Sequence, residues 1–238
     1  MAKDKAYHKR RRIWKAANRA RASYVRKIAN LWKRSIRAYV EGKDDFAIAE
    51  AMRITYVEVG GRFARMQYNK LVDQKALGDI EDEIDQLLAG YARSNMGDIT
   101  KSIQDTSASM YASIGANDLL SNDEKLKAID KMILQRAKLV TQNEIVRASN
   151  VGLEKGAQIA QVQDASNFKN TRILRTWIAT IDAVVRDAHA DADGQAVRGQ
   201  ELFQVGVDQL RYPGDPSGSV GNTINCRCVL DYQKIEND

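Results

Sequence analysis

Residues 224–232 read INCRCVLDY and hold the only two cysteines of the 238-residue chain, Cys226 and Cys228. Apolar and polar residues alternate here, which predicts a strand with both cysteines on one face and Arg227 on the other. Cysteines two positions apart pair only in a strained ring, so free thiols in a reducing compartment are expected. The stretch predicts a β element near the end of the chain.

The segment upstream of INCRCVLDY has the same β character. RTWIATIDAVV (175–185) is rich in β-formers, while DADG (191–194) and YPGDPSGS (212–219) are turn clusters. The second cluster holds both prolines of the chain. We expect it to be a surface loop for partner docking, with phosphate binding by its amides as an alternative. The chain therefore ends in a small α+β module.

The preceding residues follow a helical period instead. An apolar stripe at three- and four-residue steps includes Ile28, Trp32 and Ile36. Gly60-Gly61 predicts a break, a kink or close packing against another backbone. The predicted fold is a mainly α N-terminal region followed by a small α+β C-terminal module. The predicted division is a basic amphipathic helical arm (1–42), a helical region (43–134) and the module (135–238).

Three further helices are predicted between the arm and the module. An acidic helix follows Gly78, and a Ser- and Thr-rich helix covers residues 97–115. SNDE (121–124) resembles a capping box, in which Ser121 and Glu124 satisfy each other's backbone N–H groups. It opens a long helix that is expected to reach about residue 160.

Charge is distributed unevenly along the chain. Residues 1–40 hold 14 Lys or Arg and one acid, a net charge of +13, whereas the rest carries −7 within a total of +6. This asymmetry favours a polyanionic partner, which is nucleic acid, an acidic membrane surface or an acidic protein; a merely solvated helix face is the remaining alternative. Neither a secretory signal nor a membrane span is expected, because no apolar run is long enough. The residues expected to contact DNA or protein are Lys9, Arg10, Arg11, Arg12, Lys15, Arg19, Arg21, Arg26, Lys27, Lys33, Arg34 and Arg37.

Several short elements occur in one order between residues 135 and 232. TQNEIVRASNVG (141–152) precedes TWIATIDAVVRDAHADADGQAV (176–197), and LRYPGDPSGS (210–219) and INCRC (224–228) follow. In this order they resemble the phage Mu F-like minor head protein family, also called phage head morphogenesis proteins. The residues that carry the resemblance are Thr141, Glu144, Arg147, Trp177, Asp182, Arg186, His189, Asp193, Gly194, Pro213, Gly214, Asn225, Cys226, Arg227 and Cys228.

The resemblance implies a structural role and no enzymatic activity or cofactor. Such proteins are minor virion components inside the capsid, near the portal, and act in head assembly, DNA packaging or DNA delivery. The implied partners are portal, major capsid or scaffold proteins and packaged double-stranded DNA, with several copies per head, in the host cytoplasm during assembly. A toxin domain follows the module in some relatives, and none is expected after Asp238.

Chemical alternatives remain for the residues around His189. With Cys226 and Cys228 it has the residue types of a zinc site, although buried packing on Trp177, with His189 bonded to Asp182 or a backbone carbonyl, is the favoured interpretation. A nuclease-like enzyme using magnesium or a Cys–His pair is the alternative function, and its candidate carboxylates are Asp182, Asp191 and Asp193. A deaminase is not favoured, since its H-x-E and P-C-x-x-C motifs are absent.

An ion pair is also expected within the module. Asp182 and Arg186 lie four residues apart, so on a helix they would share one face and pair. Glu144 and Arg147 would join the same polar cluster.

Overall fold

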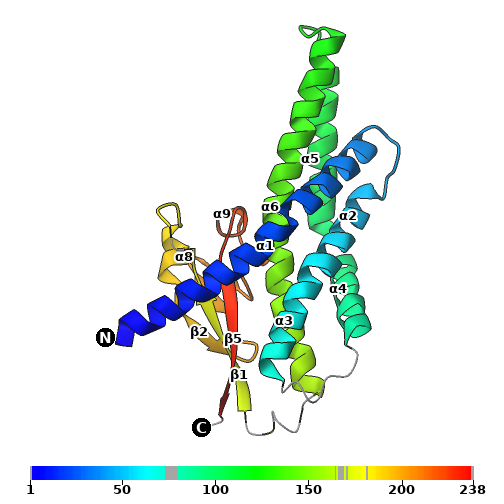
Figure 1. Cartoon of the computed structure of the whole chain (residues 1–238). Helices are drawn as coiled ribbons and strands as arrows, with labels where there is room; N and C mark the ends of the chain where they lie inside the picture. The colour runs from blue at the N-terminus through cyan, green and yellow to red at the C-terminus, as the bar shows by residue number, and fades with distance from the viewer. Residues whose placement is uncertain are drawn as a thin grey trace.

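The computed structural model describes residues 2–72, 80–163, 165, 169, 171–180 and 182–236. Long helices form one part of the molecule and a small sheet module forms the other, as Figure 1 shows. A mainly α chain with a small C-terminal α+β module was predicted, and this fold class is confirmed. Gly78, where the acidic helix was expected to begin, lies outside the described residues.

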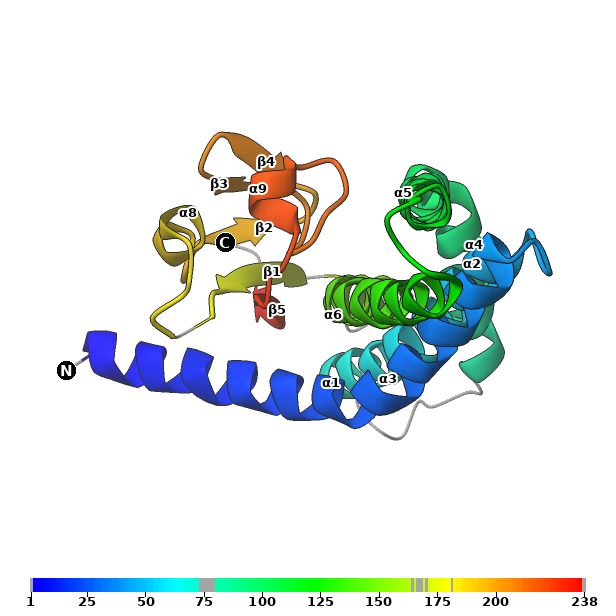
Figure 2. The same cartoon turned by 90° about the horizontal axis from the view of Figure 1, so that it is seen from above.

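Helix α1 (Ala2–Val40) spans both parts of the molecule. Figure 2 shows it running beneath the sheet module and then across α3 and α6. Its predicted apolar stripe is buried, with Ile28, Trp32 and Ile36 fully covered. Burial of such side chains stabilises the fold by about 1.5–3 kcal/mol each.

The second helical segment is continuous across Gly60-Gly61. It comprises α2 (Ala47–Thr55), one π-helical turn, η1 (Tyr56–Gly60), and α3 (Gly61–Leu71). The predicted close packing is the alternative that the structure confirms. A Cβ atom on Gly60 would lie 3.1 Å from the carbonyl oxygen of Ala148.

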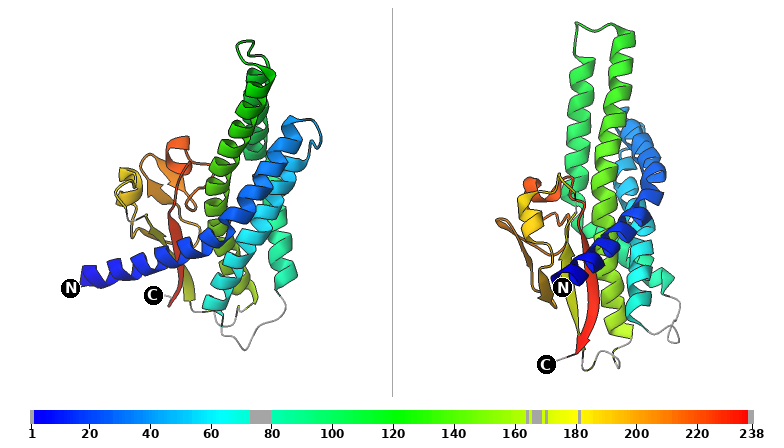
Figure 3. Two further views of the ribbon diagram at one scale, coloured as in Figure 1. Left: turned by 45° about the horizontal axis from the view of Figure 1, so that its top comes forward. Right: turned by 60° about the vertical axis from the view of Figure 1, so that its left-hand side comes forward.

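Helices α4 (Glu81–Asn95) and α5 (Gly97–Gly115) follow, and α6 (Asn122–Gln163) then crosses the whole molecule. The predicted capping box is present: the Ser121 N–H donates to Glu124 at 2.9 Å, and the Glu124 N–H donates to the Ser121 hydroxyl at 3.4 Å. Between Val140 and Ala160 most residues of α6 are buried. This helix is therefore the central element of the fold, with other elements around it (Figure 3).

The module is built on a three-stranded antiparallel sheet with strand order β2-β1-β5. Its central strand is β1 (Thr171–Ile178), flanked by β2 (Ala196–Arg198) and β5 (Val229–Glu236). A separate hairpin joins β3 (Phe203–Val205) to β4 (Asp208–Leu210). Two short helices, α8 (Asp187–Asp191) and α9 (Val220–Thr223), lie in the connections.

The predicted strand over residues 224–232 is wrong in its first half. The last strand begins at Val229, because Asn225 adopts a φ of +56° that interrupts extended backbone. Both cysteines are nevertheless buried, at 3% and 0% exposure. They lie in the turn that leads into β5 rather than on the strand.

The turn cluster YPGDPSGS also departs from expectation. A surface loop for partner docking was expected, whereas Tyr212, Pro213, Gly214 and Asp215 are buried. The Pro213 carbonyl accepts a hydrogen bond from the Asn150 amide at 3.1 Å, and that of Gly214 accepts one from Arg147 at 2.7 Å. The first half of this loop is therefore packed on α6, while Pro216 and Ser217 remain exposed.

Two glycines of α6 permit a very close helix contact. A Cβ atom at Gly152 would lie 2.1 Å from the Gly60 carbonyl oxygen, and one at Gly156 would lie 2.1 Å from that of Ala64. We therefore predict that Gly156→Ala lowers the free energy of unfolding by at least about 1–3 kcal/mol, the usual cost of overpacking. Chemical denaturation followed by circular dichroism measures this.

Gly90→Ala provides the matched control for this prediction. Gly90 lies within α4, and an added Cβ there meets nothing within 4 Å. This variant is expected to gain up to about 1 kcal/mol, because Ala is the better helix former. A Gly156→Ala protein as stable as the wild type would show that the helices separate without penalty.

Candidate functional site

A buried thiol–imidazole cluster lies where α8 meets the turn before β5. The His189 Nδ1 atom lies 3.3 Å from the Cys228 sulfur and 3.8 Å from the Cys226 sulfur. The His189 ring is 2% exposed and stands edge-on to Trp177, with ring centroids 6.0 Å apart. The expected bond from His189 to Asp182 or to a backbone carbonyl is replaced by these sulfur contacts.

The two thiols differ in their surroundings. Hydrogen bonding to Cys226, together with burial, raises the pKa of the Cys228 thiol well above its usual value. A hydrogen bond from Cys228 lowers the pKa of Cys226, and the charges of Arg21 and Arg186 lower it further. The pKa values of the two thiols are therefore shifted in opposite directions.

Arg21 lies beside the thiol–imidazole cluster. Its guanidinium is 3% exposed and donates to the Cys228 carbonyl at 3.0 Å and to the Ser149 hydroxyl at 2.8 Å. Burial lowers the pKa of Arg21 to about 10, so the side chain remains charged at neutral pH. Arg21 was predicted to contact DNA or a portal protein, and its burial corrects that prediction.

The expected Asp182–Arg186 ion pair does not form. Residues 182–186 form a bend and a turn rather than a helix, so the helical spacing that would pair the two side chains is absent. Asp182 instead holds Arg227 through two contacts, of 2.5 and 3.1 Å, and Arg186 donates to the Ile224 carbonyl. Both interactions attach the segment between β1 and α8 to the turn before β5 that carries the two cysteines.

Glu144 and Arg147 form a separate buried ion pair on α6, rather than joining Asp182. Tyr56 donates to Glu144 at 3.4 Å, and Tyr212 shares a hydrogen bond with Tyr91 close by. Burial raises the pKa of Tyr91 to about 12 and that of Tyr56 well above its usual value, so both stay neutral donors. This network connects the helices to the loop after β4.

The remaining residues of the predicted signature have structural contacts. The Asp193 carboxylate accepts bonds from the Ala179 N–H and from Arg10, both at 3.0 Å, and Gly194 has a φ of +85°. The Thr141 side chain is buried on α6. Among the described residues, only His189, Cys226 and Cys228 form a group able to hold a metal, so Asp182, Asp191 and Asp193 do not assemble the magnesium site of a nuclease.

Asn150 is the important residue that the sequence did not single out. Its amide donates to the carbonyls of Pro213 and Cys228, and its carbonyl accepts from the Leu230 N–H at 3.2 Å. The available signal was an asparagine on a buried helical face, because a buried side-chain amide needs hydrogen-bond partners.

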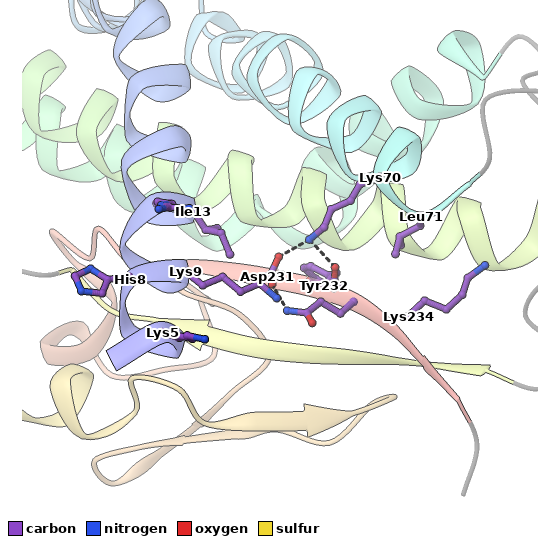
Figure 4. Close-up of a pocket in the computed structure, with 11 residues that line it drawn as sticks. Lys5, His8, Lys9, Ile13, Lys70, Leu71, Asp231, Tyr232 and Lys234 are labelled. Atoms are coloured by element: carbon purple, nitrogen blue, oxygen red, sulfur yellow. Dashed lines mark hydrogen bonds and ion pairs between the residues drawn. The ribbon is translucent and has the colours of Figure 1, made fainter. Parts of the chain in front are cut away.

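A basic groove lies near the N-terminal end of α1. It has a volume of about 900 Å³ and lies between α1, α3 and β5. Figure 4 shows Lys5 and Lys9 of α1 on one side, with Lys70 and Lys234 on the other. Arg12 also lines it, and among the described lining residues the one acid, Asp231, is bound to Lys70. The groove therefore carries an excess of positive charge.

Most of the predicted contact cations are on the surface. Arg10 is paired with Asp193, Lys27 with Glu58, and Arg37 with Asp130 and Glu41. The others, apart from the buried Arg21, are exposed: Lys9, Arg11, Arg12, Lys15, Arg19, Arg26, Lys33 and Arg34.

Comparison with known families supports the resemblance. The family model described as Phage Mu protein F like protein matches residues 93–231, more than half of the chain. The chain belongs to this family. The match begins within α4, well before residue 135, so this Mu F-like protein shares more of its helical region with the family than the motifs indicated.

Family membership associates the Mu F-like chain with phage head morphogenesis and with the virion. No curated protein and no solved structure matches this chain significantly. In the part of the chain that is described, no helix has both the length and the apolar character needed to cross a membrane.

The two arginine–carboxylate pairs of the module allow a matched stability test. Arg147→Met removes one partner of a pair whose side chains are 5% and 3% exposed, leaving Glu144 buried without a counter-charge. It should lower the free energy of unfolding by about 3–5 kcal/mol. Arg227→Met breaks a pair that is 42% and 33% exposed and should cost about 0–1 kcal/mol.

Chemical denaturation compares these variants. Adding Glu144→Gln to Arg147→Met should recover part of the loss, because the uncompensated charge is removed. Equal losses in the two single variants would contradict the assignment of Glu144–Arg147 as the structural pair.

Proposed function

We propose that this chain is a minor head protein of a tailed phage, located inside the capsid near the portal, where its basic helix contacts packaged double-stranded DNA. Family membership supports the head role. The exposed basic face of α1 supports the DNA contact. Portal, capsid or scaffold proteins are its proposed protein partners, and several copies are present in each head.

The spacing of the cations on α1 carries the DNA proposal. Lys5, Lys9, Arg12, Arg19, Arg26 and Lys33 recur at steps of three, four or seven residues, and all are exposed. Such steps place side chains along one face of a helix. At 1.5 Å per residue this basic stripe is about 42 Å long, longer than one turn of B-form DNA at about 34 Å.

The groove extends the stripe sideways. Lys5, Lys9 and Arg12 belong to both, while Lys70 and Lys234 add charge from α3 and β5. Cations from three elements converge there. A phosphate backbone that follows the stripe would meet lysines on both walls of the groove. Contact with phosphates alone is independent of base sequence, as packaged DNA requires.

Salt dependence tests the DNA contact directly. Neutralising Lys9, Arg12 and Arg19 with glutamine should weaken duplex binding and reduce the slope of log K against log salt by about one per lost phosphate contact, about three in total. The Lys127, Lys131 and Lys138 glutamine variant removes the same charge from exposed positions on α6 and is the matched control. Fluorescence anisotropy with duplex DNA measures both.

The control separates the possible outcomes. An equal loss in both triple variants would show that only net charge matters and would overturn the stripe as the contact. An absence of salt-dependent binding in the wild type would overturn the DNA contact itself and direct attention to an acidic portal surface.

Particle composition tests the head role. Quantitative mass spectrometry of purified heads should find a few to a few dozen copies of the chain in DNA-filled particles. Retention after DNA release would support a portal-side position, and loss would support delivery with the DNA. Absence of the chain from filled and emptied particles would overturn the virion role.

A further inference from the structure

The thiol–imidazole cluster has the dimensions of a metal site. Its three ligand atoms, the two sulfurs and Nδ1 of His189, all lie within 4.8 Å of one another. Zinc binds sulfur at about 2.3 Å and imidazole nitrogen at about 2.0–2.1 Å, so a tetrahedral ion holds N and S about 3.5 Å apart. The observed N–S distances of 3.3 and 3.8 Å lie on either side of this value.

The backbone conformation brings the two sulfurs together. On an extended strand, residues two apart are separated by about 6.5–7 Å along the chain. Here the left-handed Asn225 and the hydrogen bond from its N–H to the Asn143 side chain, at 2.8 Å, hold a turn in front of the strand. The C-x-C spacing can therefore chelate one ion, which a regular strand would make difficult.

The positive charge of Arg21 beside the cluster favours a thiolate at Cys226, whereas burial opposes one and helps to raise the pKa of the free Cys228 thiol. Arg21 is buried beside the two cysteines, and its hydrogen bonds go to neutral acceptors: Asn18, Ser149 and the carbonyls of Arg227 and Cys228. Two thiolates bound to a divalent ion form a cluster with no net charge. Zinc can therefore bind there without adding a second buried net charge beside Arg21.

We infer that His189, Cys226 and Cys228 bind one Zn²⁺, through Nδ1 and two thiolates. Zinc takes four ligands, and the fourth place is left to water or a small ligand from the adjoining cavity of about 610 Å³, which His189 and Cys226 line. Binding releases the two thiol protons to solvent. The ion would fix α8 to the turn before β5. This inference does not depend on the proposed head function.

Metal analysis of the full-length wild-type protein is the first test. Protein purified without chelators, or reloaded with zinc and freed of excess, should contain one zinc per chain by mass spectrometry. Cobalt substitution should give the intense near-ultraviolet absorption of thiolate-to-cobalt charge transfer, a readout that requires no variant. Less than a tenth of an equivalent of zinc after reloading, with no cobalt–thiolate band, would overturn the site and leave a packed thiol cluster.

Variants then assign the ligands. Cys226→Ser and Cys228→Ser should each lower zinc affinity by at least tenfold and remove part of the cobalt–thiolate band. His8→Asn changes the only other histidine, which is exposed on α1, and should leave both signals unchanged. Circular dichroism of each variant verifies folding before titration. Full zinc content and an intact cobalt band in both folded cysteine variants would place the metal elsewhere and overturn the assignment.

Discussion

The close contact between α6 and the α2–η1–α3 segment is the constraint on which the rest of the structure depends. Gly152 and Gly156 are one turn apart on α6, and both face carbonyl groups of the other helix at distances that exclude a Cβ atom. With the backbones this close, α6 becomes buried over most of its second half. Polar residues on that part must then find partners within the protein.

Those polar residues connect the helices to the module. Glu144 and Arg147 satisfy each other and reach Tyr56 and the Gly214 carbonyl, while Asn150 satisfies the loop at Pro213 and the strand at Leu230. The module therefore rests on α6 through hydrogen bonds from buried side chains. Its position is more specific than apolar packing alone would make it, because Glu144, Arg147 and Asn150 each have directional partners.

The sequence correctly predicted those structural features that depend on residues close together along the chain. The apolar stripe through Ile28 and Trp32 and the Ser121–Glu124 box are local patterns, so they could be read directly. Asp182 was assigned the wrong partner because its true partner, Arg227, is 45 residues away and helical spacing offered a nearer one. Asn225 delays the start of the predicted strand to Val229, since alternation of side chains does not report a positive φ.

Arg21 shows the same limit within the basic helix. By sequence it is one more cation in a run of 14, yet α1 crosses the module at this residue and buries it on the cysteine turn. Only the tertiary crossing distinguishes it from Arg19, which remains exposed. Charge patterning therefore identified the strongly basic helix but could not separate its buried face from its exposed one.

The same crossing connects the thiol–imidazole cluster with the basic stripe, the two candidate functional regions of the molecule. Trp14 and Arg21 both donate to the Arg227 carbonyl, and Arg10 pairs with Asp193, so the first half of α1 is held by the turn that carries the cysteines and by the loop after α8. The conformation of residues 225–228 therefore helps to hold the first half of α1 against the module. The thiol–imidazole cluster lies in the segment that anchors α1. Through this anchor it affects the position of the basic stripe on α1, without itself contacting a ligand that binds the stripe.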